Sequence, residues 1–263
     1  MPSVHPSRCS VSVRSILVCR DALPARCRFR PSGGFTLIEL LVVIGIIALL
    51  AALIFPAIGT SLQAARQATS LAQLKQWAGA FSLSLSDHDN EMPGDGGAQF
   101  KIDDQLAWFN RLPPKLNLPP LSKAKQEELP KMGRKSVWIN PGATDRYDGA
   151  GIPFCYGFND YLSTTAEPNM KVTRVLYPVK TILMAEKRVD DSSPAVNPDN
   201  FRANFGTKDP LDPEAITNVI FVDGHGEGIR RKVLSDVTAT RANTDDELRE
   251  AVLSWLPFEK AEK

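Results

Sequence analysis

The sequence is poor in the residues on which many enzymes and metal proteins depend. Of its 263 residues only three are His and four are Cys, and three of those Cys precede position 35. The chain beyond that position has Cys155 alone and therefore folds without an internal disulfide. It also lacks the His-Glu-x-x-His zinc motif, the Gly-x-Ser-x-Gly motif, a P-loop and a Rossmann fingerprint. We therefore expect no catalytic residues, no metal site, no cofactor and no enzymatic activity.

The chain also lacks the large positive charge that is typical of nucleic-acid-binding proteins. Its formal net charge is +1, and the positive residues are concentrated at the N-terminus. The first 34 residues contain six Arg and one Asp, a charge of +5, so residues 35–263 carry −4. Binding to DNA or RNA through a broad basic surface is therefore not expected, and we predict no nucleic-acid partner.

One long apolar run stands out from this ordinary globular composition. Residues 40–55 are sixteen residues without a polar side chain, and residues 35–58 as a helix would measure roughly 36 Å. We predict a membrane-spanning helix over about residues 38–58; a buried core helix or a cleavable secretory signal is the alternative. Because the Arg-rich segment precedes the run, the N-terminus is expected in the cytoplasm and the following chain outside it.

Glu39 is the only charged residue in the predicted span. A carboxylate inside an apolar segment costs a few kcal/mol on insertion scales and usually marks a function that involves a specific partner. Two interpretations remain open at this point. Glu39 either reaches the headgroup region or pairs with a positive group inside the membrane, such as a newly exposed α-amino group on a neighbouring subunit.

Residues 33–44, with the sequence GGFTLIELLVVI, strongly resemble the class III signal of type IV pilins and type II secretion pseudopilins. The resemblance implies cleavage after Gly34 by a prepilin peptidase/N-methyltransferase, with Gly33 and Gly34 at the processing site and N-methylation of Phe35. It also implies that Glu39 pairs with the Phe35 amine of the adjacent subunit during assembly. The implied partners are the peptidase, other pseudopilin subunits and an inner-membrane assembly platform.

The helical pattern continues beyond the predicted span. Pro56 removes one helical hydrogen bond and is expected to kink the helix. Apolar residues then recur at helical spacing and predict a face that packs on a sheet: Leu71, Leu74, Ala78, Phe81 and Leu85. An alanine-rich flank suits close helix contacts, either in a filament or inside the domain: Ala64, Ala65, Ala68 and Ala72.

The helix is predicted to end in residues 87–97, where a proline and three glycines occur. Several side chains in this stretch carry oxygen atoms that could bind calcium: Asp87, Asp89, Asn90, Glu91 and Asp95. Their spacing lacks the twelve-residue calcium-loop pattern, so a solvated helix end is the preferred interpretation. Calcium binding stays open as the alternative.

Short apolar segments in the second half of the chain predict strands. These are Val137–Asn140, Phe154–Phe158, Thr181–Glu186, Asn218–Val222 and a return strand near Gly228–Arg231. The dipeptide Asp223-Gly224 predicts the hairpin turn between the last two. A capping box at Thr244 and Glu247 predicts a C-terminal amphipathic helix whose apolar stripe serves core packing or partner binding: Leu248, Ala251, Val252, Trp255 and Leu256.

Together these patterns predict an α+β, pilin-like fold. Residues 1–34 form a basic leader, residues 35–90 a long kinked N-terminal helix, and residues 91–263 a globular domain in which a small antiparallel sheet packs on the helix. Three further segments resemble the pseudopilin-like branch of planctomycetes and verrucomicrobia that has a C-terminal His-x9-Asp-Gly motif: residues 71–76, 156–159 and 218–225. In this chain Pro213 stands at the position of that His.

The resemblance implies a structural pseudopilin or pilin-like subunit of a type II secretion or type IV pilus-like system. Such a subunit is a single-pass protein of the inner (cytoplasmic) membrane with a periplasmic C-terminal domain, and it enters a filament through its N-terminal helix. The alternative is a membrane-anchored extracytoplasmic binding module that does not polymerise.

Overall fold

The computed structural model describes residues 35–96, 100–125, 127–132, 135–143, 152–163, 170–189, 193–235 and 253–256. Contacts within the chain divide it into two compact units, Met1–Ala51 and Ala52–Lys263. The described part of the first unit is the beginning of a helix, α1 (Leu37–Asp87), in which every side chain from residue 35 to residue 50 is exposed. The predicted basic leader lies outside the described residues.

In the second unit α1 continues to Asp87, close to the predicted end of the helix. The helix continues through Pro56, which has no backbone N–H to donate, and the kink expected there stays a prediction. The end differs from the expected proline and glycine stop. Asp89 and Asn90 adopt left-handed backbone angles (φ 50° and 61°), and the Asn90 N–H donates to the Leu85 carbonyl oxygen. Asp and Asn adopt this conformation more readily than other non-glycine residues do, so they end the helix before Pro93.

The connection from α1 to the sheet is built from short helices. Within the described residues the short helical elements are α2 (Trp108–Arg111), η1 (Pro113–Leu116), η2 (Leu121–Lys123), η3 (Asp160–Leu162), η4 (Val172–Arg174) and α3 (Arg231–Ser235). The leucine-proline pairs in residues 112–130 account for this irregular region, because proline restricts its own backbone and that of the residue before it.

Five strands form one mixed sheet in the order β3-β1-β2-β4-β5. The strands are β1 (Tyr156–Asn159), β2 (Ile182–Glu186), β3 (Ala195–Val196), β4 (Ile216–Phe221) and β5 (Gly226–Arg230). The α+β class and four of the predicted strands are confirmed. The sheet is mixed, not wholly antiparallel as expected, because the two-residue β3 pairs parallel to β1 at one edge. Gly224, with a φ of 90°, occupies the predicted turn between β4 and β5.

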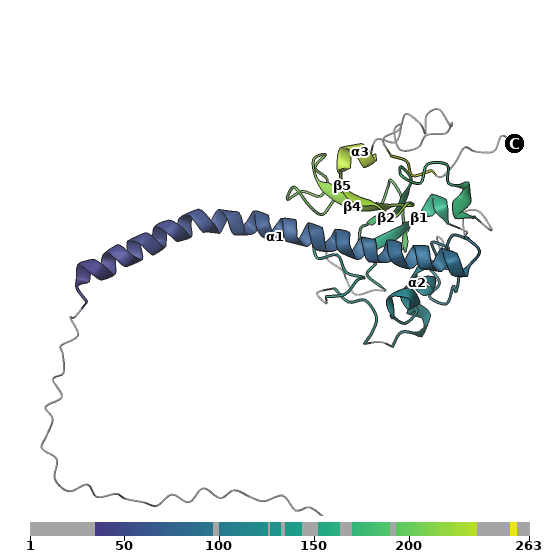
Figure 1. The fold of residues 1–263 in the computed structure, drawn as a ribbon, viewed down its shortest axis with the longest axis horizontal. Coiled ribbons are helices and arrows are strands. Elements are labelled where there is room, and N and C mark those ends of the chain that lie inside the picture. The colour runs from purple at the N-terminus through teal and green to yellow at the C-terminus, as the bar shows by residue number, and fades with distance from the viewer. Residues whose placement is uncertain are drawn as a thin grey trace, which may run out of the picture. The chain divides into compact units, whose positions relative to one another are not determined.

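The two faces of the sheet contribute to two different hydrophobic clusters. The C-terminal part of α1 runs alongside the sheet (Figure 1). One cluster joins the sheet to α1 and includes Leu74, Trp77 and Phe81 of the helix, with Phe158 and Ile220 of the strands. The rings of Phe81 and Phe158 lie 6.3 Å apart. The opposite cluster includes Val219 and Phe221 of β4, the neighbours of Ile220 in sequence, because successive residues of a strand point to opposite faces. The predicted apolar face of α1 is therefore confirmed.

The strand predicted at Val137–Asn140 is wrong. These residues form turns, in which the Ile139 N–H donates to the Ser136 carbonyl oxygen. Their apolar side chains are buried for another reason. The Trp138 ring lies 4.7 Å from that of Trp77 on α1 and 5.6 Å from that of Trp108 on α2, so it fills the space between the two helices.

The predicted C-terminal helix is wrong over the residues that the structure describes. Residues 244–252 lie outside them, whereas Ser254 forms a parallel bridge with Thr181 and Trp255 lies in a bend. The Ser254 carbonyl oxygen accepts a hydrogen bond from the Ile182 N–H. Trp255 is fully buried in the cluster on the face of the sheet away from α1, so the apolar stripe contributes a core residue from an extended segment.

Candidate functional site

The start of α1 contains a reciprocal hydrogen-bond motif between Thr36 and Glu39. Oε2 of Glu39 accepts from the Thr36 backbone N–H at 2.8 Å and from the Thr36 hydroxyl at 2.7 Å. The Glu39 N–H in turn donates to Oγ1 of Thr36 at 3.3 Å. This is a capping box, which satisfies backbone donors that have no partner inside the helix. The Thr-x-x-Glu spacing at the start of an apolar helix is the sequence signal for this motif.

Glu39 lies on a surface that is otherwise apolar. Phe35, Ile38, Val42 and Val43 line the same shallow surface depression. Their side chains are between 45% and 81% exposed, so no other residue that the structure describes covers this part of α1. By length and composition α1 is also the one helix of the described residues that is able to cross a membrane. Gly33 and Gly34, the predicted processing residues, lie outside the described part of the chain.

The alanine-rich flank of α1 is exposed. Ala64, Ala65, Ala68 and Ala72 all face away from the interior of the domain, whereas Leu74, on the apolar face, is fully buried. Of the two uses left open by the sequence, burial inside the chain's own domain is therefore excluded for these four residues. The flank is available for contact with another helix.

A buried polar network attaches α1 to the sheet, and the sequence analysis did not identify it. Its centre is the fully buried Glu186 at the end of β2. Oε1 of Glu186 lies 2.5 Å from Oγ of Ser70 on α1 and accepts from the side-chain amide of Asn218 at 2.9 Å. Its Oε2 accepts from the side-chain amide of Asn204 at 3.0 Å. Burial raises the pKa of Glu186 to about 7, although the hydrogen bonds from Ser70, Asn204 and Asn218 oppose that rise.

The network continues from Ser70 to the loop that follows α2. The hydroxyls of Ser70 and Tyr156 lie 3.0 Å apart, and the Tyr156 hydroxyl donates to Oε1 of Gln73 at 2.6 Å. Nε2 of Gln73 donates to the Ser136 carbonyl oxygen at 2.7 Å. Burial, together with the nearby Glu186 carboxyl, raises the pKa of Tyr156 well above its ordinary value. One row of side chains thus connects β2, α1, β1 and the loop.

Three acidic residues at the end of α1 and in the segment that follows it have different partners. Asp87 pairs with Lys115, and Asp89 pairs with Lys171 at 2.5 Å. Hydrogen bonds and charge from these lysines lower the pKa of both carboxyls. The buried Asp95 accepts from the Ser163 hydroxyl. Within the described residues, no group of three or more His, Cys, Asp or Glu side chains is arranged to hold a metal ion.

The hairpin tip holds His225 in a compact arrangement. Its Nδ1 lies 2.6 Å from Oδ1 of Asp223, and its ring stacks on Phe221 with 4.3 Å between centroids. The Asp223 carboxylate also accepts from the His225 backbone N–H at 3.1 Å, a local turn contact. The contacts that Asp223 and His225 make are therefore accounted for by the hairpin turn itself.

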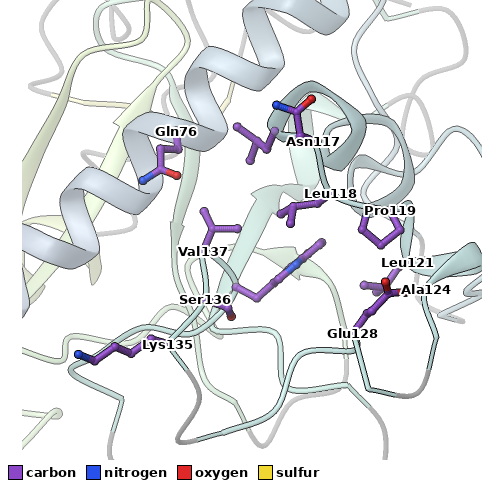
Figure 2. A pocket seen from close by; sticks show the side chains of 12 residues that line it. Gln76, Asn117, Leu118, Pro119, Leu121, Ala124, Glu128, Lys135, Ser136 and Val137 are labelled. Atoms are coloured by element: carbon purple, nitrogen blue, oxygen red, sulfur yellow. The ribbon is translucent and has the colours of Figure 1, made fainter. Parts of the chain in front are cut away.

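Two of the cavities in the second unit border α1. The one in Figure 2 has a volume of about 570 Å³ and lies between Gln76 of α1, the leucine-proline segment around Leu118 and the turn at Ser136–Trp138. The other has a volume of about 600 Å³ and is lined by Arg66 and Gln73 of α1 with Lys135 and Asn140. Both have mixed polar and apolar walls, and Lys135 lies between them. Neither contains a nucleophile paired with a base.

Comparison with known proteins identifies one family model. Residues 29–55 match the model described as the prokaryotic N-terminal methylation motif. The match covers the end of the basic segment, Gly33, Gly34, Phe35, the capping box and the whole apolar run of residues 40–55. The comparisons found no curated protein and no solved structure that matches the chain. The chain therefore carries a prepilin-type methylation motif at its N-terminal end.

Proposed function

We propose that this chain, which carries a prepilin-type N-terminal methylation motif, is a structural pilin-like or pseudopilin subunit. The single observation that carries the proposal is the match of residues 29–55 to the methylation-motif model. A membrane-peptidase signal of this kind requires a basic segment, a small residue at the cleavage point and an apolar helix in fixed order. All three are present here, with Gly34 at the cleavage point.

The exposed surfaces of α1 support a role in assembly. From residue 35 to residue 50 every side chain is exposed, so this part of the helix needs a bilayer or neighbouring helices to cover it. The four exposed alanines that begin at Ala64 extend a surface for close packing beyond the predicted span. In a filament of such subunits the α1 helices pack against one another.

The proposed processing and assembly steps assign roles to four residues. The prepilin peptidase cleaves after Gly34, with Gly33 beside the cut, and methylates the new amine of Phe35. Glu39 then contacts the Phe35 amine of the neighbouring subunit, which sets the register between helices. The subunit waits in the inner membrane with its C-terminal domain in the periplasm, and the assembly platform of a type II secretion or type IV pilus-like system moves it into the filament.

The first experiment is mass spectrometry of the N-terminus of the protein extracted from the membranes of its host. We expect the mature chain to begin at N-methylated Phe35. An intact leader would indicate a plain signal anchor, and an N-terminus beyond Phe55 would indicate a secreted domain. Either of these results contradicts the proposal.

A second experiment separates a filament subunit from an anchored binding module that does not polymerise. Two exposed positions of α1, changed as Ile38→Cys and Ile54→Cys, are combined with a bifunctional thiol cross-linker in host membranes, in a chain whose four native cysteines are replaced by serine. A filament subunit gives a ladder of cross-linked multimers, and the same chain with Gly34→Val gives none because it is not processed. An absence of ladders from a correctly processed chain contradicts assembly through α1.

A further inference from the structure

In the row of polar side chains between Glu186 and Ser136, the donor and the acceptor of each hydrogen bond can be assigned by counting the available hydrogens. The Ser136 backbone carbonyl oxygen is only an acceptor, so the Gln73 group beside it, at 2.7 Å, is the amide NH₂. The other end of the Gln73 amide is then its oxygen, which also only accepts. The hydrogen between Gln73 and Tyr156, at 2.6 Å, must therefore come from the Tyr156 hydroxyl.

The same count fixes the hydrogens of Ser70. Tyr156 has one hydroxyl hydrogen, and Gln73 receives it, so the contact of 3.0 Å between Tyr156 and Ser70 requires Ser70 to donate. Ser70 also has only one hydrogen. The remaining contact, 2.5 Å between Oγ of Ser70 and Oε1 of Glu186, therefore has no hydrogen unless Glu186 supplies it.

We infer that Glu186 is a protonated carboxylic acid in the native protein and donates its hydrogen to Ser70, so that loss of this proton weakens the attachment of α1 to the sheet. Ionisation would require Ser70 to turn its hydrogen toward Glu186, and the hydrogen bond between Ser70 and Tyr156 would then be lost. Because all three side chains are buried, no solvent replaces the missing bond.

The surroundings of Glu186 support a neutral side chain. The elements packed around it present uncharged groups to its carboxyl: Ser70 from α1, Asn218 from β4 and Asn204 from the segment before β4. Tyr156 on β1 is also titratable, but burial and the nearby Glu186 carboxyl raise its pKa well above the ordinary value, so it is neutral where Glu186 titrates. Arg202 reaches Glu186 through backbone atoms, since its N–H donates to the Glu186 carbonyl oxygen at 3.0 Å. Burial also raises the pKa of Glu186 itself to about 7.

The test is a pH titration of the Glu186 side-chain carbon by NMR, on the full-length protein in detergent with ¹³C-labelled glutamate. The resonance is assigned by its absence in Glu186→Gln. We expect a midpoint near 7. Tyr156→Phe removes the hydroxyl that receives the Ser70 hydrogen, so that hydrogen can move to the carboxylate and stabilise the ionised form. The midpoint should then fall by roughly one pH unit, the equivalent of one hydrogen bond.

Two further variants keep the test decisive. Gln73→Leu removes the acceptor of Tyr156, so the Tyr156 hydrogen is free to point at Ser70, and the midpoint should fall in the same direction even if Tyr156→Phe does not fold. Tyr161→Phe changes a half-buried tyrosine of the other hydrophobic cluster and should leave the midpoint unchanged. A wild-type midpoint near 4.5 overturns the inference. So does a midpoint that is equal to or higher than that of the wild type in whichever of Tyr156→Phe and Gln73→Leu folds.

The consequence for helix attachment is measured by amide hydrogen exchange in residues 70–85 of α1. Wild type and Glu186→Gln are compared at equal pH, which removes the intrinsic pH dependence of exchange. We expect exchange in the wild type to accelerate relative to the variant as the pH rises through the midpoint. A constant ratio across that range shows that the proton does not hold the helix. These measurements require no filament, so their result is independent of the proposed assembly function.

Discussion

Oγ of Ser70 on α1 and Oε1 of Glu186 on β2 lie 2.5 Å apart although 116 positions separate them in the sequence. This contact joins the helix to the middle of the sheet, because β2 pairs with β1 on one side and β4 on the other. A buried polar contact of this kind requires every neighbouring donor and acceptor to be in place. It therefore selects one position of α1 on the sheet, where the apolar contacts around Phe81 alone would permit small shifts.

The first prediction concerns the pH dependence of stability. The pKa of Glu186 is about 7 in the folded chain and 4.5 as an ordinary glutamate. The folded state therefore binds this proton more tightly, and the stability that Glu186 contributes is complete below pH 4.5 and lost as the pH rises through 7. The loss amounts to about 3 kcal/mol. It is measured as the difference between wild type and Glu186→Gln in denaturant unfolding at several pH values.

The exposed carboxylates of Asp87 and Asp89 change the stability with pH in the opposite direction from Glu186. Lys115 and Lys171 lower the pKa of Asp87 and Asp89, so the stability that these pairs contribute is lost as the pH falls below about 4.

Tryptophan fluorescence is a suitable probe of unfolding, because all four tryptophans lie after residue 58 and report on the sheet-containing unit. A difference in unfolding free energy between wild type and Glu186→Gln that stays constant from pH 4.5 to pH 7.5 would contradict the prediction for Glu186.

The second prediction separates the two roles available to Glu39. Glu39→Ala should leave membrane insertion intact and reduce incorporation into filaments, because it removes the charge expected to meet the Phe35 amine. Glu39→Gln keeps an oxygen for the capping box but no charge, and it should show the same loss. Thr36→Ala removes the cap and keeps the charge, and it should assemble nearly as the wild type does. Incorporation is measured from sheared filament fractions and membrane fractions of the host.

The reverse pattern has a definite meaning. Normal assembly of Glu39→Gln together with poor assembly of Thr36→Ala assigns Glu39 to the capping box, worth about 1 kcal/mol to the start of the helix. The charge would then have no part in assembly, and the pairing with Phe35 would be wrong.

The third prediction contrasts two glycines. A Cβ at Gly157 on β1 would lie 2.8 Å from backbone atoms of Ala195 and Val196, so Gly157→Ala should push β3 away and destabilise the fold by about 1–3 kcal/mol. At Gly79, inside α1, a Cβ meets no atom within 4 Å. Gly79→Ala should therefore stabilise the helix by about 0.5–1 kcal/mol. Both values come from unfolding in denaturant, and equal effects of the two changes would contradict the close packing of β3 on β1.

The fourth prediction compares a buried cation with a half-buried one. The guanidinium of Arg111 donates to the carbonyl oxygens of Met92 and Glu91 at 3.0 Å each, which fixes the segment after α1. Arg111→Met leaves these acceptors unpaired and should cost about 1–3 kcal/mol. Lys115→Met removes the surface pair with Asp87 and should cost less than about 1 kcal/mol. Denaturant midpoints of the two variants decide the order, and a larger loss for Lys115→Met would contradict it.

The sequence predicted those elements whose patterns are long or locally determined. The apolar run and the helical spacing of residues such as Leu74 and Phe81 predicted α1, and Asp223-Gly224 predicted the hairpin. The strand pattern failed at Trp138, because a short apolar segment can be buried by a turn as well as by a strand. It also failed at Trp255, where hydrogen bonds with the segment before β2 replace a helix. β3 was missed because two residues are too few to show a pattern.

The residues of the candidate site likewise divide into those that a local sequence pattern predicts and those that it does not. The processing motif with Glu39 is a local signal, and its residues are consecutive. The network of Glu186 combines a helix, three strands and two loops, and its members are too far apart in the sequence to suggest contact. A glutamate at the end of an apolar strand is ordinarily solvent-exposed, so nothing in the sequence indicated that Glu186 is buried.

The continuity of α1 has a mechanical consequence. The same helix that begins beside Phe35 carries Ser70 and Phe81 into the folded domain, and no loop interrupts it. If the proposed assembly takes place, a pull on the N-terminal end during extraction from the bilayer would reach the domain along one helix with no loop in between. The side-chain contacts of residues 70–85 would then carry the applied force, and their strength would set the force at which the sheet separates from α1.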